Sequence, residues 1–247
     1  MKKVLLLFTI FASLLACSND DDSSTPSNNI PDDLPDVSQV TFTSPTTITN
    51  NYFGPQTTGT IYVYEAGDIG EEPEEEIRIE IRTNTKTVMG VTCFIQHDVV
   101  YKDGILIEDT DDWIAEDDNG NLWYFGESVK NYDDDGDFED NDGSWEAGID
   151  DALPGYWLPI APYVGLTYHQ EYWEDEAEDY AEVLSTNETV TIDLGTYQNC
   201  LMTKDENPFE TGEYEIKYYA PDIGFIKEEK YVNGALVEME QLVEIIE

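Results

Sequence analysis

Oxygen-bearing side chains alternate with other residues in one short segment of this chain, residues 131–142. A calcium loop has such a pattern, because Ca²⁺ takes roughly six to eight oxygen ligands and the loop supplies them from positions 1, 3, 5, 7, 9 and 12, with glycine at position 6. Gly136 stands at the sixth position. The segment is therefore a candidate site for calcium, although no cofactor is required. The ligand positions are occupied by Asn131, Asp133, Asp135, Asp137, Glu139 and Asp142.

Three features of this segment depart from the usual calcium loop. Asn131 replaces the first Asp, and the side chain of Asp142 is one methylene shorter than that of the usual bidentate Glu. The flanking residues have strand-like patterns, so the pair of helices that normally holds such a loop is not expected. The alternative is an acidic hairpin tip that binds no metal.

Aromatic side chains are concentrated in the middle third of the chain. Exposed rings beside carboxylates are a common way to hold sugars, whereas buried rings dominate the interiors of β-sheets. In a strand over these residues, Trp123 and Phe125 share one face, and Leu122 and Tyr124 share the other. Both interpretations stay open for the candidate ligand-binding residues. These are Trp113, Trp123, Tyr124, Trp145 and Trp157.

Residue patterns typical of nucleophilic or metal-dependent catalysis are absent from the sequence. It has two histidines, His97 and His169, and neither a His-Glu-x-x-His motif nor a Gly-x-Ser-x-Gly elbow. His97 stands beside Asp98 and is expected to be a surface or cross-strand residue. A pair of carboxylates can hydrolyse glycosides, but with 55 acidic residues the sequence cannot nominate the pair. We therefore predict no catalytic residues and keep a hydrolase only as an alternative.

The chain is strongly acidic. It has 11 Lys and Arg against 55 Asp and Glu, a formal charge of −44, which becomes about −46 if Lys2 and Lys3 are removed with a leader. Such a charge repels phosphate backbones and anionic lipid headgroups. This excludes nucleic acid as a partner and favours cationic ligands. Surface acidity that only keeps a secreted protein hydrated is the alternative.

The first residues have the order of a secretory signal: Lys2 and Lys3, then a largely apolar run over residues 4–16, too short to span a bilayer. The end of this run, Leu14-Leu15-Ala16 followed by Cys17, resembles the bacterial lipobox. The resemblance implies diacylglycerol on the Cys17 thiol, cleavage before Cys17 and acylation of the new amino terminus. An ordinary signal with an incidental cysteine is the alternative.

The residues after Cys17 are acidic and polar. Residues 18–22, Ser-Asn-Asp-Asp-Asp, resemble the export signal of surface lipoproteins of Bacteroidota-type bacteria. Residues 17–39 hold too few bulky apolar side chains to fold and are predicted to be a disordered tether. The predicted organisation is a signal peptide at 1–16, the lipidated tether at 17–39 and a single β domain at 40–247. The resemblance implies a palmitate-type lipid anchor in the outer membrane, facing the cell surface or, as the alternative, the periplasm.

The two remaining cysteines, Cys93 and Cys200, lie in strand-like runs. Export to an oxidising compartment permits disulfides. We predict a Cys93–Cys200 bridge, which would close a loop of about 100 residues and add about 4 kcal/mol in the chain-entropy model. Two buried reduced thiols are the alternative.

Alternation and turn dipeptides predict a mostly β domain. At residues 77–82 isoleucines alternate with charged residues, as in a half-buried strand. Asp-Gly or Asn-Gly pairs at 103–104, 119–120, 135–136 and 233–234 predict tight hairpins with positive φ at both central residues. The predicted antiparallel meander has strands at 99–102, 105–115, 122–129 and around Trp145, and a C-terminal hairpin joins 225–232 to 235–246.

Two segments do not follow the alternation. Residues 153–162 are rich in proline, which cannot donate to a ladder, so a loop or edge connection is predicted there. Residues 173–184 carry an apolar stripe with helical spacing, but the many like charges between 174 and 182 oppose a helix. Helix and hairpin both stay open for 173–184.

Between residues 90 and 229, about 140 residues, the chain resembles an uncharacterised family of secreted bacterial proteins. The resemblance is carried by Asp112-Trp113 and by the segments 120–127, 144–148, 177–179 and 218–224. It implies no known activity, but it implies an open, half-barrel-like sheet similar to that of lipoprotein carriers. The segment after Asn131 is more acidic than the family pattern. The predicted fold class is mostly β: a single antiparallel, strongly curved sheet with at most one short helix.

The sequence thus predicts an outer-membrane-anchored lipoprotein that acts as a non-catalytic binding or interaction module. Its partner is the membrane, through the N-terminal lipid, and its ligand is expected to be cationic, a glycan or apolar. No protein partner is indicated. The alternatives are a carrier or chaperone with an apolar half-barrel cavity, a carbohydrate-active or other hydrolase, and a calcium-stabilised structural domain.

Overall fold

The computed structural model describes residues 30, 31 and 33–247. These residues form strands, turns and loops, with no helix among them. The predicted signal peptide and Cys17 lie outside the described residues, as does most of the predicted tether. The strands are β1 (Ile61–Asp68), β2 (Glu75–Val88), β3 (Val91–Lys102), β4 (Ile105–Glu116), β5 (Leu122–Tyr132), β6 (Phe138–Asp140), β7 (Trp145–Glu146), β8 (Leu153–Leu158), β9 (Thr167–His169), β10 (Glu171–Tyr172), β11 (Tyr180–Ile192), β12 (Gly195–Glu206), β13 (Glu213–Ala220), β14 (Gly224–Val232) and β15 (Ala235–Ile246).

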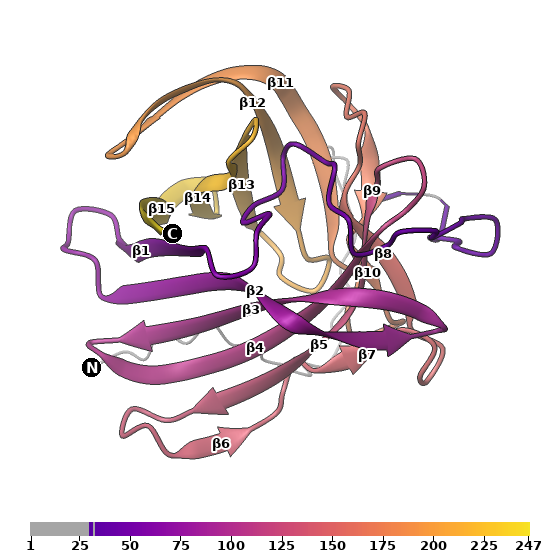
Figure 1. Cartoon of the computed structure of the whole chain (residues 1–247). Helices are drawn as coiled ribbons and strands as arrows, with labels where there is room; N and C mark the ends of the chain where they lie inside the picture. The colour runs from indigo at the N-terminus through magenta and orange to yellow at the C-terminus, as the bar shows by residue number, and fades with distance from the viewer. Residues whose placement is uncertain (1–29, 32) are drawn as a thin grey trace, which may run out of the picture.

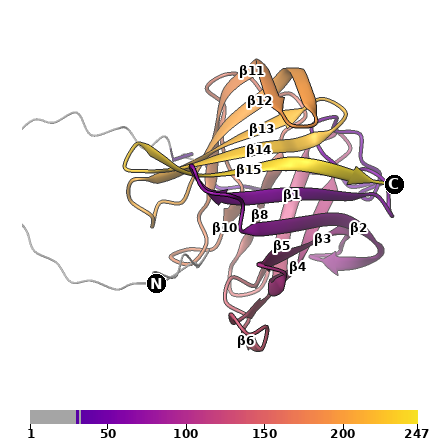
Figure 2. The same cartoon turned by 90° about the vertical axis from the view of Figure 1, so that its left-hand side faces the viewer.

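All these strands belong to one antiparallel sheet, which confirms the predicted mostly β fold with a single sheet. The order is β10-β8-β5-β4-β3-β2-β1-β15-β14-β13-β12-β11-β9, with β6 and β7 paired to β5. β1 and β15 lie side by side in the middle of this order, between β2–β5 and β11–β14 (Figure 2). β9 and β10 stand at opposite ends, yet only Gln170 separates them in the chain. The sheet therefore bends until its two ends meet (Figure 1).

The predicted meander is confirmed, because β3, β4 and β5 pair in sequence order. The dipeptides at 103–104 and 233–234 have the expected positive φ at both residues, 51° and 81° in the first and 52° and 77° in the second. At 119–120 and 135–136 only the glycine has positive φ. There the connections are longer than two residues, so the tight-turn prediction is wrong at these two places.

The proline-rich segment contains a strand that the sequence did not predict. β8 pairs with β5 on one side and β10 on the other, and Pro154 lies opposite Glu171. The short pairing with β10 tolerates the missing proline N–H. Gly155 allows the two ends of the sheet to approach, since a Cβ there would lie 2.2 Å from the carbonyl oxygen of Gln170. The loop prediction is therefore right only for residues 159–162.

Residues 173–184 form no helix. Trp173 forms an isolated antiparallel bridge with Ala177, and β11 begins at Tyr180. The Trp173 N–H donates to the Ala177 carbonyl at 2.6 Å, and the Ala177 N–H donates back at 2.9 Å. Of the two alternatives for this segment, the structure has the hairpin.

Two hydrophobic clusters form the core. The first contains side chains from β3, β4, β5, β8, β11 and β12, and the N-terminal segment packs on it through Val37, Val40 and Phe42. The second lies around β1, β12, β14 and β15, with Tyr64 and Leu242 fully buried. The two clusters cover different regions of the same sheet.

The cysteines are free thiols and belong to different clusters, so the predicted disulfide is not formed. Cys93 lies on β3 in the first cluster, and Cys200 lies on β12 in the second, with β2, β1, β15, β14 and β13 between these strands in the sheet. Both side chains are completely buried. The second alternative, two buried reduced thiols, describes this structure.

Within residues 30, 31 and 33–247, no helix has the length and apolar character needed to cross a membrane.

Candidate cation-binding site

The candidate calcium residues surround the turn between β5 and β6. The Asp133 carboxylate accepts hydrogen bonds from the backbone N–H groups of Asp135 and Asp137 at 3.0 and 2.9 Å, and Asn131 donates to Asp140 at 2.8 Å. These hydrogen bonds order the turn without a metal ion. In the described part of the chain, no group of three His, Cys, Asp or Glu residues is arranged to hold a metal ion. Calcium binding by this turn stays a prediction.

The candidate aromatic residues are buried, which contradicts their interpretation as exposed sugar-binding rings. Trp113, Trp123, Tyr124 and Trp145 all belong to the first cluster, and Trp157 packs against it half-buried. Both faces of β5 are covered here, because Phe42 packs on Phe125 on one face and Trp145 and Trp157 pack on Tyr124 on the other. Three of the five rings nevertheless meet: Tyr124 lies edge-on to Trp145 at 5.4 Å and to Trp157 at 5.0 Å.

The histidines make separate contacts. His97 Nδ1 lies 3.0 Å from both the Asp111 carboxylate and the Thr110 carbonyl on the neighbouring strand, as expected for a cross-strand residue. His169 lies on β9, and its Nε2 is 3.3 Å from the carbonyl oxygen of Pro31. Neither contact forms a catalytic arrangement.

The structure brings together a set of acidic side chains that the sequence did not single out. Directly opposed residues of an antiparallel pair share a face, and Gln96 lies opposite Asp112, which lies opposite Glu127. Asp98 is two residues from Gln96 and so shares this face. We call Asp98, Asp112, Glu127, Glu171 and Asp179 the carboxylate cluster.

Asp112 is the centre of the cluster. It is only 4% exposed, and its carboxylate accepts hydrogen bonds from the Tyr124 hydroxyl at 2.8 Å and the Gln96 amide at 3.3 Å. Burial raises the pKa of Asp112 to about 7, although these two hydrogen bonds oppose the rise. Burial, followed by the charge of Asp112, also raises the pKa values of Asp98 and Glu127 well above the usual range. Solvent reaches Asp98 and Glu127, which are half-buried.

Glu171 and Asp179 extend the cluster from the end of the sheet. The N–H of Glu171 donates to the carbonyl of Asp179 at 3.4 Å, which holds the two residues side by side. Burial raises the pKa of Glu171 to about 7, and the charge of Asp112 adds to the effect. Burial and the charge of Glu171 raise the pKa of Asp179 well above its usual range. The charge of Asp112 on β4 thus acts on Glu171 of β10, and the charge of Glu171 acts on Asp179, the residue before β11.

A second acidic group on the same face is compensated by a lysine. On β13, Lys217 lies opposite Glu228 of β14, which lies opposite Glu240 of β15. The Lys217 Nζ is 3.0 Å from Glu215, 3.4 Å from Asp205 and 3.6 Å from Glu228. The charges of these carboxylates keep the pKa of Lys217 well above its usual range despite burial.

The carboxylate cluster has no such partner. Each of the nine Lys and Arg side chains among the described residues forms an ion pair with an acidic residue outside the cluster. Lys217 acts on Glu171 and Asp179 only at longer range. The buried charge of the cluster is therefore relieved by protonation rather than by an ion pair.

Two polar atoms at the cluster have no hydrogen-bond partner. Trp145, which lies opposite Glu127 and is 5% exposed, has a buried Nε1 without an acceptor. The Asp179 Oδ1 is also buried, with no donor in ordinary hydrogen-bond geometry. Both residues nevertheless interact with Glu171, because hydrogen bonding by Asp179 and by Trp145 opposes the rise in the Glu171 pKa that burial causes. Such atoms are rare in folded proteins, because an unpaired buried polar group costs about 1–3 kcal/mol.

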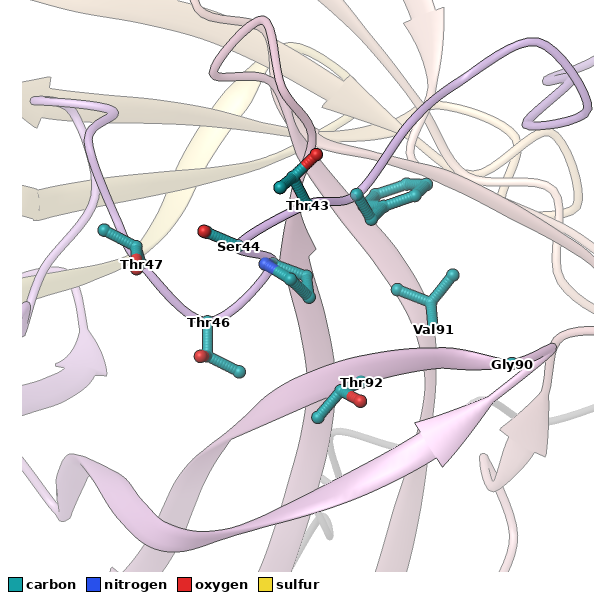
Figure 3. A pocket seen from close by; sticks show the side chains of 9 residues that line it. Thr43, Ser44, Thr46, Thr47, Gly90, Val91 and Thr92 are labelled. Atoms are coloured by element: carbon teal, nitrogen blue, oxygen red, sulfur yellow. The ribbon is translucent and has the colours of Figure 1, made fainter.

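The pockets found in the described structure lie elsewhere. One of about 550 Å³ opens between the N-terminal segment, which lines it with residues 42–47, and the β2–β3 turn, which lines it with residues 90–92 (Figure 3). Its lining has no charged side chain. A second of about 640 Å³ is lined by acidic residues of the β1–β2 connection together with an arginine and a tyrosine. Neither contains a residue predicted from the sequence as a site.

Sequence reasoning missed the cluster because each member is an ordinary acid in a strand that also carries other acids. The one available signal was the period of β4, where Asp112 interrupts the apolar face two residues from Ile114; on β5 the register shift between the pairs Asp112–Glu127 and Ile114–Tyr124 removes this signal for Glu127. That signal does not show which acids on different strands meet. Only the register and the bending of the sheet do so.

No protein-family model and no curated protein matches the chain. Two solved structures are weakly similar to it. A protein proposed to be exported, with a YMCC-like fold, from Bacteroides fragilis has 16% sequence identity and a TM-score of 0.46, over 80% of this chain and 100% of that one. A proposed lipoprotein from Parabacteroides distasonis has 15% identity and a TM-score of 0.45, over 79% of this chain and 99% of that one.

Proposed function

We propose that this chain is a non-catalytic binding module, held in the outer membrane by a lipid on Cys17 and facing the cell surface, that binds a positively charged ligand at the carboxylate cluster. The observation that carries the ligand proposal is the set of five converging carboxylates that form no ion pair with a basic side chain of the described structure. Above the raised pKa values of Asp112 and Glu171, which are both about 7, these carboxyls ionise and a cation would neutralise them. The strongly negative chain would also attract cations from a distance.

The chemistry of this face favours a cationic ligand over the alternatives. An apolar carrier would need a large apolar concavity, whereas acidic side chains lie on this face. A glycoside hydrolase would need two carboxyls in contact with a sugar, and Asp112 and Glu171 are 4% and 6% exposed. A small cation that enters past the half-buried Asp98 and Glu127 fits this burial better.

Membrane attachment is supported by the leader and the lipobox resemblance around Cys17. Cys17→Ser should move the mature protein from the membrane to the soluble fraction, because several acyl chains hold a protein on a membrane. Protease treatment of intact cells should cleave the wild-type protein if it faces outward. Unchanged membrane fractionation of the variant would contradict lipid anchoring, and full protection from protease would favour the periplasmic face.

Ligand binding can be tested on the purified mature chain by calorimetric titration with cationic probes. The double variant Asp98→Asn/Glu127→Gln should lose binding, because it removes the two solvent-accessible charges of the cluster. Asp193→Asn, at an exposed residue of the β11–β12 turn, is the control for loss of acidity. Equal binding by the double variant and the control would place the binding elsewhere.

A further inference from the structure

We infer that the uncharged pocket between residues 42–47 and residues 90–92 binds a neutral carbohydrate, held as a single pyranose ring. None of the lining residues belongs to the carboxylate cluster, so the inference goes beyond the proposed function. Three features support it: a lining without charge, side-chain hydroxyls that have no partner in the described structure, and a lining turn fixed by hydrogen bonds at both ends.

The lining of this pocket differs in charge from the rest of the molecule. Charged residues make up 27% of the chain, yet none of the lining residues is charged. An ionic ligand would lose water here without gaining a counter-charge, whereas a neutral polar ligand needs only hydrogen bonds. The volume of about 550 Å³ lies within the range of about 300–1,000 Å³ that small-ligand sites usually have. The pocket therefore suits a small neutral ligand.

Hydroxyl groups supply the polar part of the lining. Those of Ser44, Thr46, Thr47 and Thr92 form no hydrogen bond with any residue that the structure describes. They come from two segments that are far apart in the sequence, the N-terminal segment and the start of β3 (Figure 3). A hydroxyl can both donate and accept a hydrogen bond. Sugar hydroxyls do the same, so the ring and the lining can exchange hydrogen bonds in either direction.

Apolar side chains complete the lining. Phe42, Pro45 and Val91 are half-buried, and the Phe42 ring lies edge-on to Phe125 at 5.8 Å, which fixes its orientation. A pyranose has a face of C–H groups inside a rim of hydroxyls, and aromatic and aliphatic groups pack on such a face. A purely apolar ligand would instead leave the lining hydroxyls unpaired. The combination of apolar atoms and hydroxyls thus favours a sugar.

Two acidic residues hold the lining turn of the N-terminal segment at both of its ends. The Asp118 carboxylate accepts hydrogen bonds from the N–H and the hydroxyl of Thr43, both at 2.7 Å. The Glu116 carboxylate accepts them from the N–H and the hydroxyl of Thr49, at 2.6 and 2.5 Å. Between these contacts the Pro45 carbonyl accepts the Glu116 N–H at 2.9 Å. The turn is therefore ordered before a ligand arrives, which reduces the entropy lost on binding.

The test is calorimetric titration of the mature chain with three neutral probes, the methyl α-pyranosides of D-glucose, D-galactose and D-mannose. We expect at least one of them to bind with a dissociation constant in the millimolar range or below. The matching uronate, in which a carboxylate replaces the exocyclic hydroxymethyl group of the tightest binder, should bind at least about tenfold more weakly. The reason is that the pocket offers no counter-charge and the acidic chain repels anions.

Two double variants locate the binding. Thr46→Val/Thr92→Val removes one hydroxyl from each wall and keeps the shape of both side chains, so it should weaken binding at least about tenfold through the loss of two hydrogen bonds. Thr83→Val/Thr189→Val removes two exposed hydroxyls of β2 and β11 outside the pocket and should bind as wild type. Circular dichroism and thermal melting check folding. If the first variant does not fold, the contrast between the neutral sugar and its uronate in the wild-type chain decides.

The outcomes separate this inference from the proposed function. No binding of any neutral probe at tens of millimolar would overturn the inference, as would equal affinity of wild type and Thr46→Val/Thr92→Val. Binding of the uronate as tightly as the neutral sugar would overturn the requirement for a neutral ligand. Asp98→Asn/Glu127→Gln should bind the sugar as wild type does, and loss of sugar binding in that variant would place the sugar at the carboxylate cluster. Cation binding and sugar binding can therefore fail independently.

Discussion

The stability of this protein should decrease as the pH rises from about 4 to about 8, and Asp112 should be a main cause. Asp112 is buried on β4 and its pKa rises from 3.8 to about 7 on folding, chiefly because burial disfavours the charged form. Most aspartates in folded proteins behave in the opposite way, since partners lower their pKa. The sign of the pH dependence is therefore diagnostic.

The magnitude follows from the shift. A difference of about 3 pKa units corresponds to about 4 kcal/mol, at about 1.4 kcal/mol per unit, and this is an upper bound because the carboxyl of Asp98 forms a hydrogen bond with that of Asp112 and shares its titration. Below pH 4 the carboxyl is protonated in both states and contributes nothing. Between the unfolded and folded pKa values the native state binds more protons, so stability falls with pH. Above the folded pKa the full cost is present.

The assay is urea unfolding of wild type and Asp112→Asn at intervals from pH 5 to pH 9. Asparagine is neutral and can still accept the Tyr124 hydrogen bond, so at pH 5, about one unit above the unfolded pKa, the variant should be more stable than wild type by only about 1.5 kcal/mol. At pH 9 it should be the more stable protein by up to about 4 kcal/mol. Glu139→Gln controls for the lower overall charge.

Parallel stability profiles of wild type and Asp112→Asn over this range would refute the reasoning. They would mean that the Asp112 pKa does not change on folding and that its carboxyl is hydrated in the folded protein. A variant that is less stable than wild type by the same amount at every pH would show only the loss of a hydrogen bond.

Three further predictions concern packing and charge. Gly155→Ala should reduce the free energy of unfolding by at least about 2 kcal/mol in the same assay, because the new Cβ would collide with the Gln170 carbonyl. Unchanged stability would mean that the ends of the sheet are not in contact. Cys93 and Cys200 should both be alkylated after denaturation without reductant. In the native protein Cys93 should react slowly, because burial raises its pKa to about 12. A mass showing no added alkyl groups at these two residues after denaturation would indicate a bridge. Lys217→Met should cost about 3–5 kcal/mol at pH 8, because it leaves three carboxylates without their cation; a loss below about 1 kcal/mol would contradict the central role of that ion cluster.

Local patterns were predictable from the sequence where neighbouring residues decide the outcome. The Asp-Gly pair at 103–104 and the Asn-Gly pair at 233–234 form the expected turns, because both residues tolerate positive φ. The alternation at 77–82 likewise places Ile77 and Ile81 in the core. Pro154 was misleading, because it predicts a loop where pairing with β5 and β10 forms a strand. The apolar stripe at 173–184 was ambiguous between helix and hairpin, because pairing with distant strands decides its structure.

Composition and local pattern suffice to identify an acidic, mostly β domain, because turn residues and alternating side chains delimit its strands. Which side chains meet depends on how distant strands pair. Cys93 and Cys200 are separated because their strands lie apart in the sheet, and the five acids of the carboxylate cluster converge because the sheet bends until β9 and β10 meet. Strand register and the bending of the sheet bring together acids that are far apart in the sequence, and local sequence patterns carry no information about such distances.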